Sequence, residues 1–226
     1  MFPYDAISEY QNWRKAVARR PSTEIDPQAK VRFTIDRSTK IASAGSCFAK
    51  RISESLREYG FNYYLAEPGP PWLTAAQKAE YGYGLYSARY GNIYTTLQLL
   101  QLCRRMTGDF SPVESIWRGK DGELLDPFRP TIQPGGFASI EELEADRTFH
   151  LAAVKRMFEE IDVFVFTLGL TETFCHREDQ AAYPVCPGRG IGEFDPDRYV
   201  SFVGLTKWLH HARVECRTIC PPSATA

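Results

Sequence analysis

Residues 40–49 read Lys-Ile-Ala-Ser-Ala-Gly-Ser-Cys-Phe-Ala, and this stretch decides the fold. Lys40–Ala44 has the pattern of a short strand that ends in small residues. Apolar side chains then recur at helical spacing, which predicts a helix directly after the strand: Phe48, Ile52, Leu56 and Tyr59. Gly60 follows, a residue typical of helix C-termini. The stretch therefore predicts a strand, a tight turn and a helix.

The sequence that flanks this stretch extends it to a β-α-β unit. Phe61–Leu65 returns to an extended, aromatic pattern, so a second strand is expected after the helix. Val163–Leu168 is the strongest strand of the chain and is apolar on both faces. That pattern is typical of a central parallel strand covered by helices on both sides. The fold class predicted is α/β with a parallel sheet.

Two longer helices are expected between these strands. The first spans Thr95–Met106 and the second runs from Ser139 to about Glu160, where Ser139 and Glu142 have the spacing of a capping box. The apolar residues expected to face the core are Leu99, Leu102, Cys103 and Met106 in the first helix and Leu143, Leu151, Val154 and Phe158 in the second. Residues 75–94 are rich in Tyr and Gly and predict a structured loop. Four of its tyrosines either line a sugar-binding surface or pack the loop: Tyr81, Tyr83, Tyr86 and Tyr90.

Composition excludes several classes of protein. The 226 residues carry 27 Lys plus Arg against 28 Asp plus Glu, a net charge of -1, which argues against a nucleic-acid partner. The apolar fraction of 43% is that of a folded chain. No stretch has the length of a membrane span, and the first residues lack the pattern of a secretory signal, so a cytoplasmic protein is predicted. No cofactor is predicted.

The six cysteines are scattered, without a CxxC pair. Cys216 and Cys220 follow His210 and His211, but the spacing matches no standard zinc pattern. Reduced thiols, some of them buried, are the preferred interpretation over a metal site.

Two turns carry residues capable of chemistry. Gly45-Ser46-Cys47 joins the first strand to its helix, where the ligand crevice of an open α/β sheet lies. Ser46 is a candidate nucleophile beside a helix N-terminus, although a serine there also serves as an N-cap. Cys47 is a rival nucleophile, ranked lower because it adjoins Phe48 on the face expected to point to the core. Gly169-Leu170-Thr171-Glu172 follows the strongest strand and is a second crevice turn, or a plain turn with a capping Thr.

These motifs resemble those of the GSCFA family. The resemblance rests on Ala44-Gly45-Ser46-Cys47-Phe48-Ala49 and Thr167-Leu168-Gly169-Leu170-Thr171-Glu172, and is supported by residues 90–95 and 183–188. That family is grouped with the SGNH (GDSL-like) hydrolases, which implies a three-layer α/β/α sandwich. It also implies Ser46 as nucleophile, with the backbone N–H groups of Ser46 and Gly91 and the side chain of Thr171 as oxyanion donors. Asn92, Gly169 and Glu172 complete the binding set.

The chain departs from the SGNH pattern at its end. SGNH enzymes carry a catalytic Asp-x-x-His block, and this sequence has none. A fold incomplete at the C-terminus is therefore expected, from truncation, a frame shift or a genuine short variant. Among the histidines, His176 is the candidate base, against the alternative of a solvated loop residue. His150 is expected at the surface or boundary of its helix.

The predicted organisation is an N-terminal arm and linker at 1–38, a GSCFA/SGNH-like domain at 39–200 and a divergent, disordered or frame-shifted tail at 201–226. The predicted function is that of a serine esterase or acyltransferase, with a small-molecule or carbohydrate ester as substrate. The alternatives are a binding module without catalysis, for a glycan or a small molecule, and an inactive fragment.

Overall fold

A computed structural model describes residues 7–25, 31–188 and 191–203. The chain divides into two compact units, Met1–Asp36 and Arg37–Ala226. The first contains three short helical turns, η1 (Glu9–Gln11), η2 (Arg14–Ala18) and η3 (Ser22–Glu24), and none of their residues is buried.

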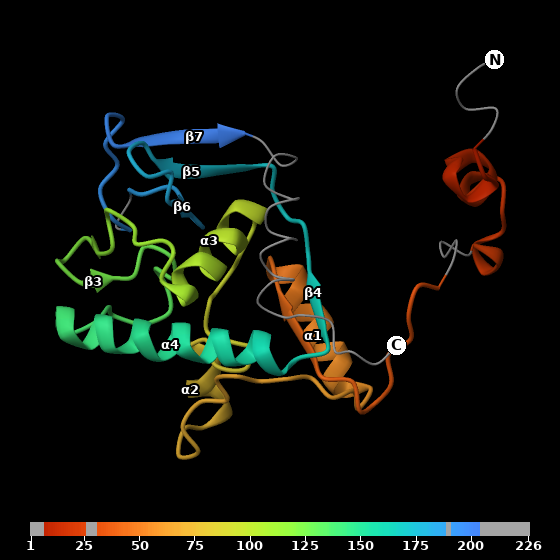
Figure 1. Ribbon diagram of the computed structural model, residues 1–226, viewed down its shortest axis with the longest axis horizontal. Coiled ribbons are helices and arrows are strands. Elements are labelled where there is room, and N and C mark those ends of the chain that lie inside the picture. Colours follow the sequence, from red (N-terminus) through yellow and green to blue (C-terminus); the bar gives the residue numbers. More distant parts are fainter. Residues whose placement is uncertain (1–6, 26–30, 189–190, 204–226) are drawn as a thin grey trace. The chain divides into compact units, whose positions relative to one another are not determined.

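The second unit contains all the strands and longer helices that the structure describes (Figure 1). In chain order they are β1 (Ile41–Ala44), α1 (Cys47–Glu58), α2 (Ala75–Glu80), α3 (Thr96–Thr107), β2 (Trp117–Arg118), β3 (Leu124–Leu125), α4 (Ile140–Glu160), β4 (Val163–Phe166), β5 (Glu172–His176), β6 (Ala182–Tyr183) and β7 (Tyr199–Val203).

A parallel pair of strands lies at the start of the second unit. β1 and β4 pair in register from Ile41↔Val163 to Ala44↔Phe166. On the other edge of β1, Ile41 forms a parallel bridge to Tyr63, so the chain after α1 returns beside β1. This contact is a single bridge and not the strand predicted over Phe61–Leu65. Gly60 ends α1 with φ +73°, a conformation that glycine adopts without strain. The α/β class is confirmed as a two-stranded parallel sheet with helices.

The expectation that Val163–Leu168 forms a central strand buried on both faces is wrong. All four residues of β4 are half-buried, and Leu168 beyond it is 57% exposed. Within the described ranges β1 is the strand that pairs with β4, so the opposite edge of β4 is left uncovered. Apolar residues on both faces predicted a strand correctly here, but they did not determine its place in the sheet.

The face that α1 turns to the core also differs from the prediction. Phe48 and Tyr59 are 64% and 69% exposed, whereas the buried residues are Ala49 and Ser53. The Ser53 hydroxyl lies 2.8 Å from the Lys50 carbonyl oxygen and 3.1 Å from that of Leu85, which satisfies a polar group inside the fold. The small side chains of Ala49 and Ser53 let α1 approach its neighbours closely. A prediction based on large apolar side chains gives these two residues the least weight.

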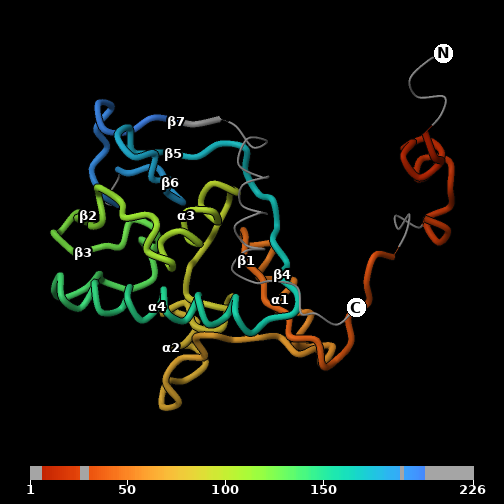
Figure 2. Tube along the Cα trace, in the orientation of Figure 1, coloured from red at the N-terminus to blue at the C-terminus, as the bar shows by residue number. Residues whose placement is uncertain are grey.

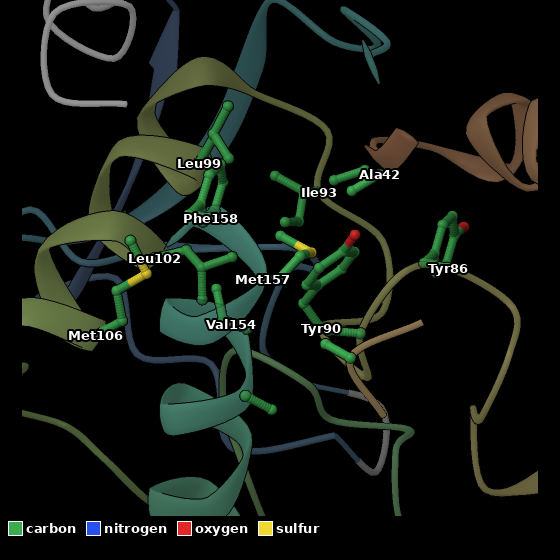
Figure 3. Close-up of a cluster of buried hydrophobic side chains, with 14 of the residues drawn as sticks. Ala42, Tyr86, Tyr90, Ile93, Leu99, Leu102, Met106, Val154, Met157 and Phe158 are labelled. Atoms are coloured by element: carbon green, nitrogen blue, oxygen red, sulfur yellow. The ribbon is translucent and has the colours of Figure 1, made fainter. Parts of the chain in front are cut away.

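α3 and α4 follow the prediction closely. Their N-caps are Thr95 and Ser139, whose hydroxyls accept the backbone N–H groups of Gln98 and Glu142. In α4 the Glu142 carboxylate accepts the N–H of Ala138 and does not close the expected box. The two helices pack face to face in the main core, with the rings of Tyr90 and Phe158 among them (Figure 3). Of the residues predicted to face this core, Leu151 is the one only partly buried.

The Tyr-rich loop packs inward. Tyr86 and Tyr90 are 5% and 2% exposed, and the Tyr90 hydroxyl donates to the carbonyl of Ser43 on β1. Tyr83 is half-buried beneath the guanidinium of Arg89, 4.3 Å from its ring centroid. Of the two alternatives for these tyrosines, the structure shows packing.

Two antiparallel sheets complete the described part of the chain. β2 pairs with β3, and β5 is flanked by β6 and β7 (Figure 2). The second of these continues directly from the turn after β4, so β5 carries the chain from the parallel pair into a separate sheet. β7 reaches Val203, three residues beyond the predicted end of the domain at residue 200.

Candidate active site

Ser46 lies where β1 ends and α1 begins. It is half-buried with an extended backbone, and its hydroxyl accepts the N–H of Phe48 at 3.3 Å. Ser46 is therefore the N-cap of α1, and the capping role weighed from the sequence is real. A cap hydroxyl at 3.3 Å is held loosely enough to point elsewhere, so the cap does not exclude a chemical role.

Gly45 brings the two crevice turns together. Its φ is +145°, and a Cβ built on it would lie 2.0 Å from Thr167 Oγ1, which leaves no room for any side chain. Thr167 Oγ1 in turn accepts the backbone N–H of Ser46 at 3.2 Å. Thr167, which follows β4, thus holds the backbone of Ser46 through its side chain. Only glycine at position 45 leaves room for this contact.

Gly169 lies directly beside Ser46. A Cβ built on Gly169 would be 3.5 Å from the Cβ of Ser46, an ordinary van der Waals contact, and 3.2 Å from the Tyr94 carbonyl oxygen. That same oxygen accepts the N–H groups of Gly169 and Leu170 at 3.2 and 2.9 Å. The turn 168–170 is therefore held next to the serine by one backbone carbonyl.

The segment 91–94 runs alongside both turns. The N–H of Ile93 donates to the Gly45 carbonyl at 2.9 Å. The Tyr86 hydroxyl lies 2.6 Å from Asn92 Oδ1 and 3.2 Å from the carbonyl oxygen of Ser46. Burial raises the pKa of Tyr86 to about 12, so this hydroxyl remains a donor at neutral pH. Gly91 has φ +66° with open space around a built Cβ, so its glycine serves the backbone conformation alone.

Two of the predicted residues have no contact with Ser46 in the part of the chain that the structure describes. Thr171 and Glu172 are exposed, and Glu172 borders a cleft of about 250 Å³ formed with Tyr94 and Leu170. The backbone N–H of Ser46, expected as an oxyanion donor, is already engaged by Thr167. The structure thus brings together Ser46, Gly169 and the segment 91–94, and places Glu172 at the rim of a neighbouring cleft.

His176 is a strand residue of β5, so the solvated-loop alternative is wrong. It is 7% exposed, and its Nδ1 lies 3.3 Å from Asp179 Oδ1. It lies four positions beyond Glu172 in β5, about 13 Å along the strand. It borders a different cavity, of about 630 Å³, together with Glu114 and Arg198. The cavity that the candidate base borders is not lined by the candidate nucleophile.

Cys47 is exposed and lies on no core-facing stripe, which corrects the reason for ranking it below Ser46. Cys186 is also exposed, whereas Cys103 and Cys175 are buried. Within 7–25, 31–188 and 191–203 no group of His, Cys, Asp or Glu side chains is arranged to hold a metal ion. Cys216, Cys220, His210 and His211 lie outside the described residues.

His150 is fully buried, which contradicts the expected surface position. It is 1% exposed, and its Nδ1 lies 2.6 Å from Glu67 Oε2, an oxygen that also accepts the backbone N–H of Arg89 at 2.7 Å. Burial raises the pKa of Glu67, but the hydrogen bonds from His150 and Arg89 bring it below its usual value. Burial lowers the pKa of His150, and the nearby Arg129 lowers it further. The imidazole is therefore neutral at pH 7.

A network of ion pairs surrounds this histidine. Asp146 binds the guanidinium groups of Arg89 and Arg129 at 2.7 and 2.8 Å, and Asp126 binds Arg129 at 3.0 Å. Arg129 and Asp126 are almost completely buried. We name the buried charge network by its members: Glu67, Arg89, Arg105, Asp126, Arg129, Asp146, Arg147 and His150. Sequence reasoning missed it because its members lie far apart in the chain and have no common spacing.

The network reaches the neighbourhood of Ser46 through Asn92. Asn92 borders a small cavity together with Arg105, Arg129 and His150, and it also bonds to Tyr86 as described above. Pro184 borders both this cavity and the cleft beside Glu172. The segment 91–94 thus separates the Ser46 turn from the charged interior.

Comparison with known proteins gives one match. A family model described as the GSCFA family matches residues 40–218, which is most of the chain. Neither a curated protein nor a solved structure matches. The matched range includes both crevice turns, the segment between them and all of the buried charge network. The chain belongs to the GSCFA family.

Proposed function

We propose that this chain is an SGNH-like serine ester hydrolase or acyltransferase whose nucleophile is Ser46. The observation that carries the proposal is the contact between Ser46 and Gly169, which joins the carboxyl ends of two parallel strands. Ligand sites in open α/β sheets lie at such ends. The serine is half-exposed, as a nucleophile that meets a substrate must be.

In the proposed reaction Ser46 Oγ attacks an ester carbonyl and forms an acyl-enzyme, and the alcohol leaves. Water or an acceptor alcohol then releases the acyl group. The free N–H groups and positive end of α1 favour the oxyanion, with Gly91 and Thr171 as the further donors. The N–H of Gly169 is engaged by Tyr94, so Gly169 contributes close backbone approach to Ser46. Asn92 and Glu172 border the space on either side of the segment 91–94. No metal or other cofactor takes part in the proposed reaction.

A serine hydroxyl needs a base to accept its proton. His176 has that role in the proposal. His176→Gln keeps the size and polarity of the side chain but cannot accept the proton. A loss of turnover with an unchanged KM supports His176 as the base, and full turnover removes it from the proposal.

The proposal extends to the fold and the substrate. We propose that β1 and β4 belong to a three-layer α/β/α sandwich, as in SGNH hydrolases. The carbohydrate ester is the substrate class by analogy with that superfamily alone, because the Tyr-rich loop packs inward.

The described helices include none that is long and apolar enough to cross a bilayer.

The test is the hydrolysis of a short-chain p-nitrophenyl ester by the full chain and three variants. Ser46→Ala removes the hydroxyl and the cap, whereas Ser46→Asn removes the hydroxyl and keeps a good N-cap. Cys47→Ala removes the adjacent exposed thiol. We expect kcat/KM to fall about 10³-fold or more in both Ser46 variants and to change little in Cys47→Ala.

The alternative functions predict other results. Equal rates in the wild type and Ser46→Ala reject the esterase. Loss in Cys47→Ala alone transfers the role of nucleophile to the thiol. A binding module shows no turnover but retains ligand binding in Ser46→Ala. An inactive fragment lacks a sharp cooperative melting transition.

A further inference from the structure

The small cavity next to Asn92 has an unusual lining. Its volume is about 20 Å³, enough for one group of the size of a water molecule or a halide ion. Arg105, Arg129 and His150 border it, and these residues are 8%, 3% and 1% exposed. The cavity is thus lined by two guanidinium groups and an imidazole that are almost wholly withdrawn from water.

Polar atoms of this lining lack partners. Arg129 Nη1 and His150 Nε2 are buried and form no hydrogen bond within the described part of the chain. Arg129 Nη1 is a donor, whereas His150 Nε2 is an acceptor, because the neutral imidazole carries its proton on Nδ1 toward Glu67. Buried polar atoms without a partner are rare in folded proteins, because each costs the free energy of its desolvation. Two such atoms on one cavity indicate that something other than protein satisfies them.

Arg105 adds a further positive charge to the lining, and its nearest favourable charge is Asp126, which it shares with Arg129 and Arg147. Its guanidinium stacks over the ring of Phe128 at 3.8 Å and forms no ion pair in the described ranges. Burial lowers its pKa to about 10, which leaves it charged at neutral pH. The neighbouring carboxylates are already engaged, because Asp126 and Asp146 both bind Arg129.

The charges of the buried network do not balance. Its buried members are three arginines, Arg89, Arg105 and Arg129, against two carboxylates, Glu67 and Asp126, with a neutral His150. Asp146 and Arg147, which are partly exposed, add one charge of each sign. One positive charge is in excess. An uncompensated buried charge strongly destabilises the folded state. A bound anion compensates this charge and so lowers the free energy of the folded state, whereas a water molecule carries no charge to compensate it.

We propose that this cavity is a binding site for one small monovalent anion, held by Arg105 and Arg129 beside His150. Its ligand is a halide ion or a carboxylate oxygen. The carboxylate has two sources: a free acid such as formate, or an organic acid whose chain leaves past Asn92, which is exposed. In the second case the chain of the acid extends past Asn92 toward the Ser46 turn. Only in that case does the cavity concern the substrate of the proposed function.

The first experiment locates the ion. A crystal of the wild-type chain grown with sodium bromide is expected to show an anomalous bromide peak in the cavity, within contact of Arg105 and Arg129. Density for water there without an anomalous peak overturns the proposal. The measurement uses no turnover, so it holds whether or not Ser46 is a nucleophile.

The second experiment follows thermal unfolding at constant ionic strength, with sodium gluconate replaced stepwise by chloride or formate. We expect a saturable rise in Tm of a few degrees in the wild type, because a ligand of the folded state stabilises it by mass action. Arg105→Met keeps an unbranched apolar stem but loses the charge, and the rise is expected to disappear. Arg118→Met, which removes an exposed arginine, is the matched control and keeps the rise.

An equal response in Arg105→Met and Arg118→Met, or none in the wild type, contradicts the site. Monomethyl succinate distinguishes the two sources. A rise in Tm with this ester assigns the site to organic carboxylates whose chain passes Asn92. A response to chloride and formate without one to monomethyl succinate assigns it to free ions.

Discussion

The Ser46 turn and the buried charge network lie on opposite sides of one short segment, residues 91–94, and differ in almost every physical respect. The turn is half-exposed and is built from small side chains and backbone hydrogen bonds. The network is buried and is built from long charged side chains that bind one another. The difference separates the turn that carries the proposed nucleophile from the residues that bind one another inside the fold.

The two regions should therefore respond differently to the same perturbation. Changes in the network should lower the free energy of unfolding, and changes at the turn should alter activity more than stability. Four predictions test this division, and they follow in order of decreasing effect.

Acid should cause the largest loss of stability, because it acts on the whole network at once. The pKa of His150 lies below its ordinary 6.5, so folding opposes its protonation and stability begins to fall below about pH 6.5. The pKa values of Glu67 and Asp146 lie below their ordinary 4.5 and 3.8. Their contribution is present above those values and is lost as the pH falls through the lower, folded-state values. Urea unfolding from pH 8 to pH 3 measures this, and a flat profile over that range contradicts it.

Asp126→Asn should be the most damaging single change in the network. It leaves Arg129 and its neighbours without a fully buried carboxylate partner, and we expect a loss of about 3–5 kcal/mol in urea unfolding. Glu54→Gln is the control, because Glu54 forms ion pairs on the partly exposed surface of α1. Such pairs contribute about 0–1 kcal/mol. Similar losses in both variants would remove the distinction between buried and surface charges.

Gly45→Ala should cost more than Gly91→Ala. Both glycines have positive φ, so both variants carry a backbone penalty of about 1–3 kcal/mol. At position 45 the new methyl group also meets Thr167 Oγ1 at 2.0 Å, whereas position 91 has open space. The difference in Tm between the two variants measures the cost of the contact with Thr167, because the backbone penalty is common to both. Equal destabilisation would mean that the turns are not in contact in solution.

Ser46→Ala should have the smallest effect on stability. Loss of the N-cap costs about 1 kcal/mol, and Ser46→Asn should recover most of it. Urea unfolding of the two variants measures this, and a loss near that of Asp126→Asn would place Ser46 among the structural residues. A variant that folds well but does not turn over ester is the result that separates the two regions most clearly.

The elements defined by local patterns were predictable. α3 and α4 have helical spacing and capping residues, and β1 and β4 are short apolar runs bounded by small residues. The two crevice turns could be found because glycine marks each of them and parallel strands end at the same edge of a sheet. Their contact was an expectation from topology that the geometry at Gly169 supports.

The remaining features depend on partners distant in sequence. Glu67 and His150 are 83 residues apart, so no window of sequence shows that one orients the other. The exposure of Phe48 depends on the small residues of α1 that make the close contact, and apolarity alone ranked these lowest. The half-burial of β4 depends on which strand lies beside it. Burial and charge pairing are properties of the assembled fold, and local spacing does not contain them.

The carbonyl of Tyr94 accepts two backbone N–H groups from the turn 168–170, and the N–H of Ile93 reaches Gly45. Main-chain atoms make these contacts, so replacing the side chain at position 94 leaves them in place. Inserting or deleting one residue between Gly91 and the start of α3 would instead shift the carbonyl out of line and release the turn from the serine. Homologous chains are therefore free to vary in residue type at this position but are constrained in the length of the segment.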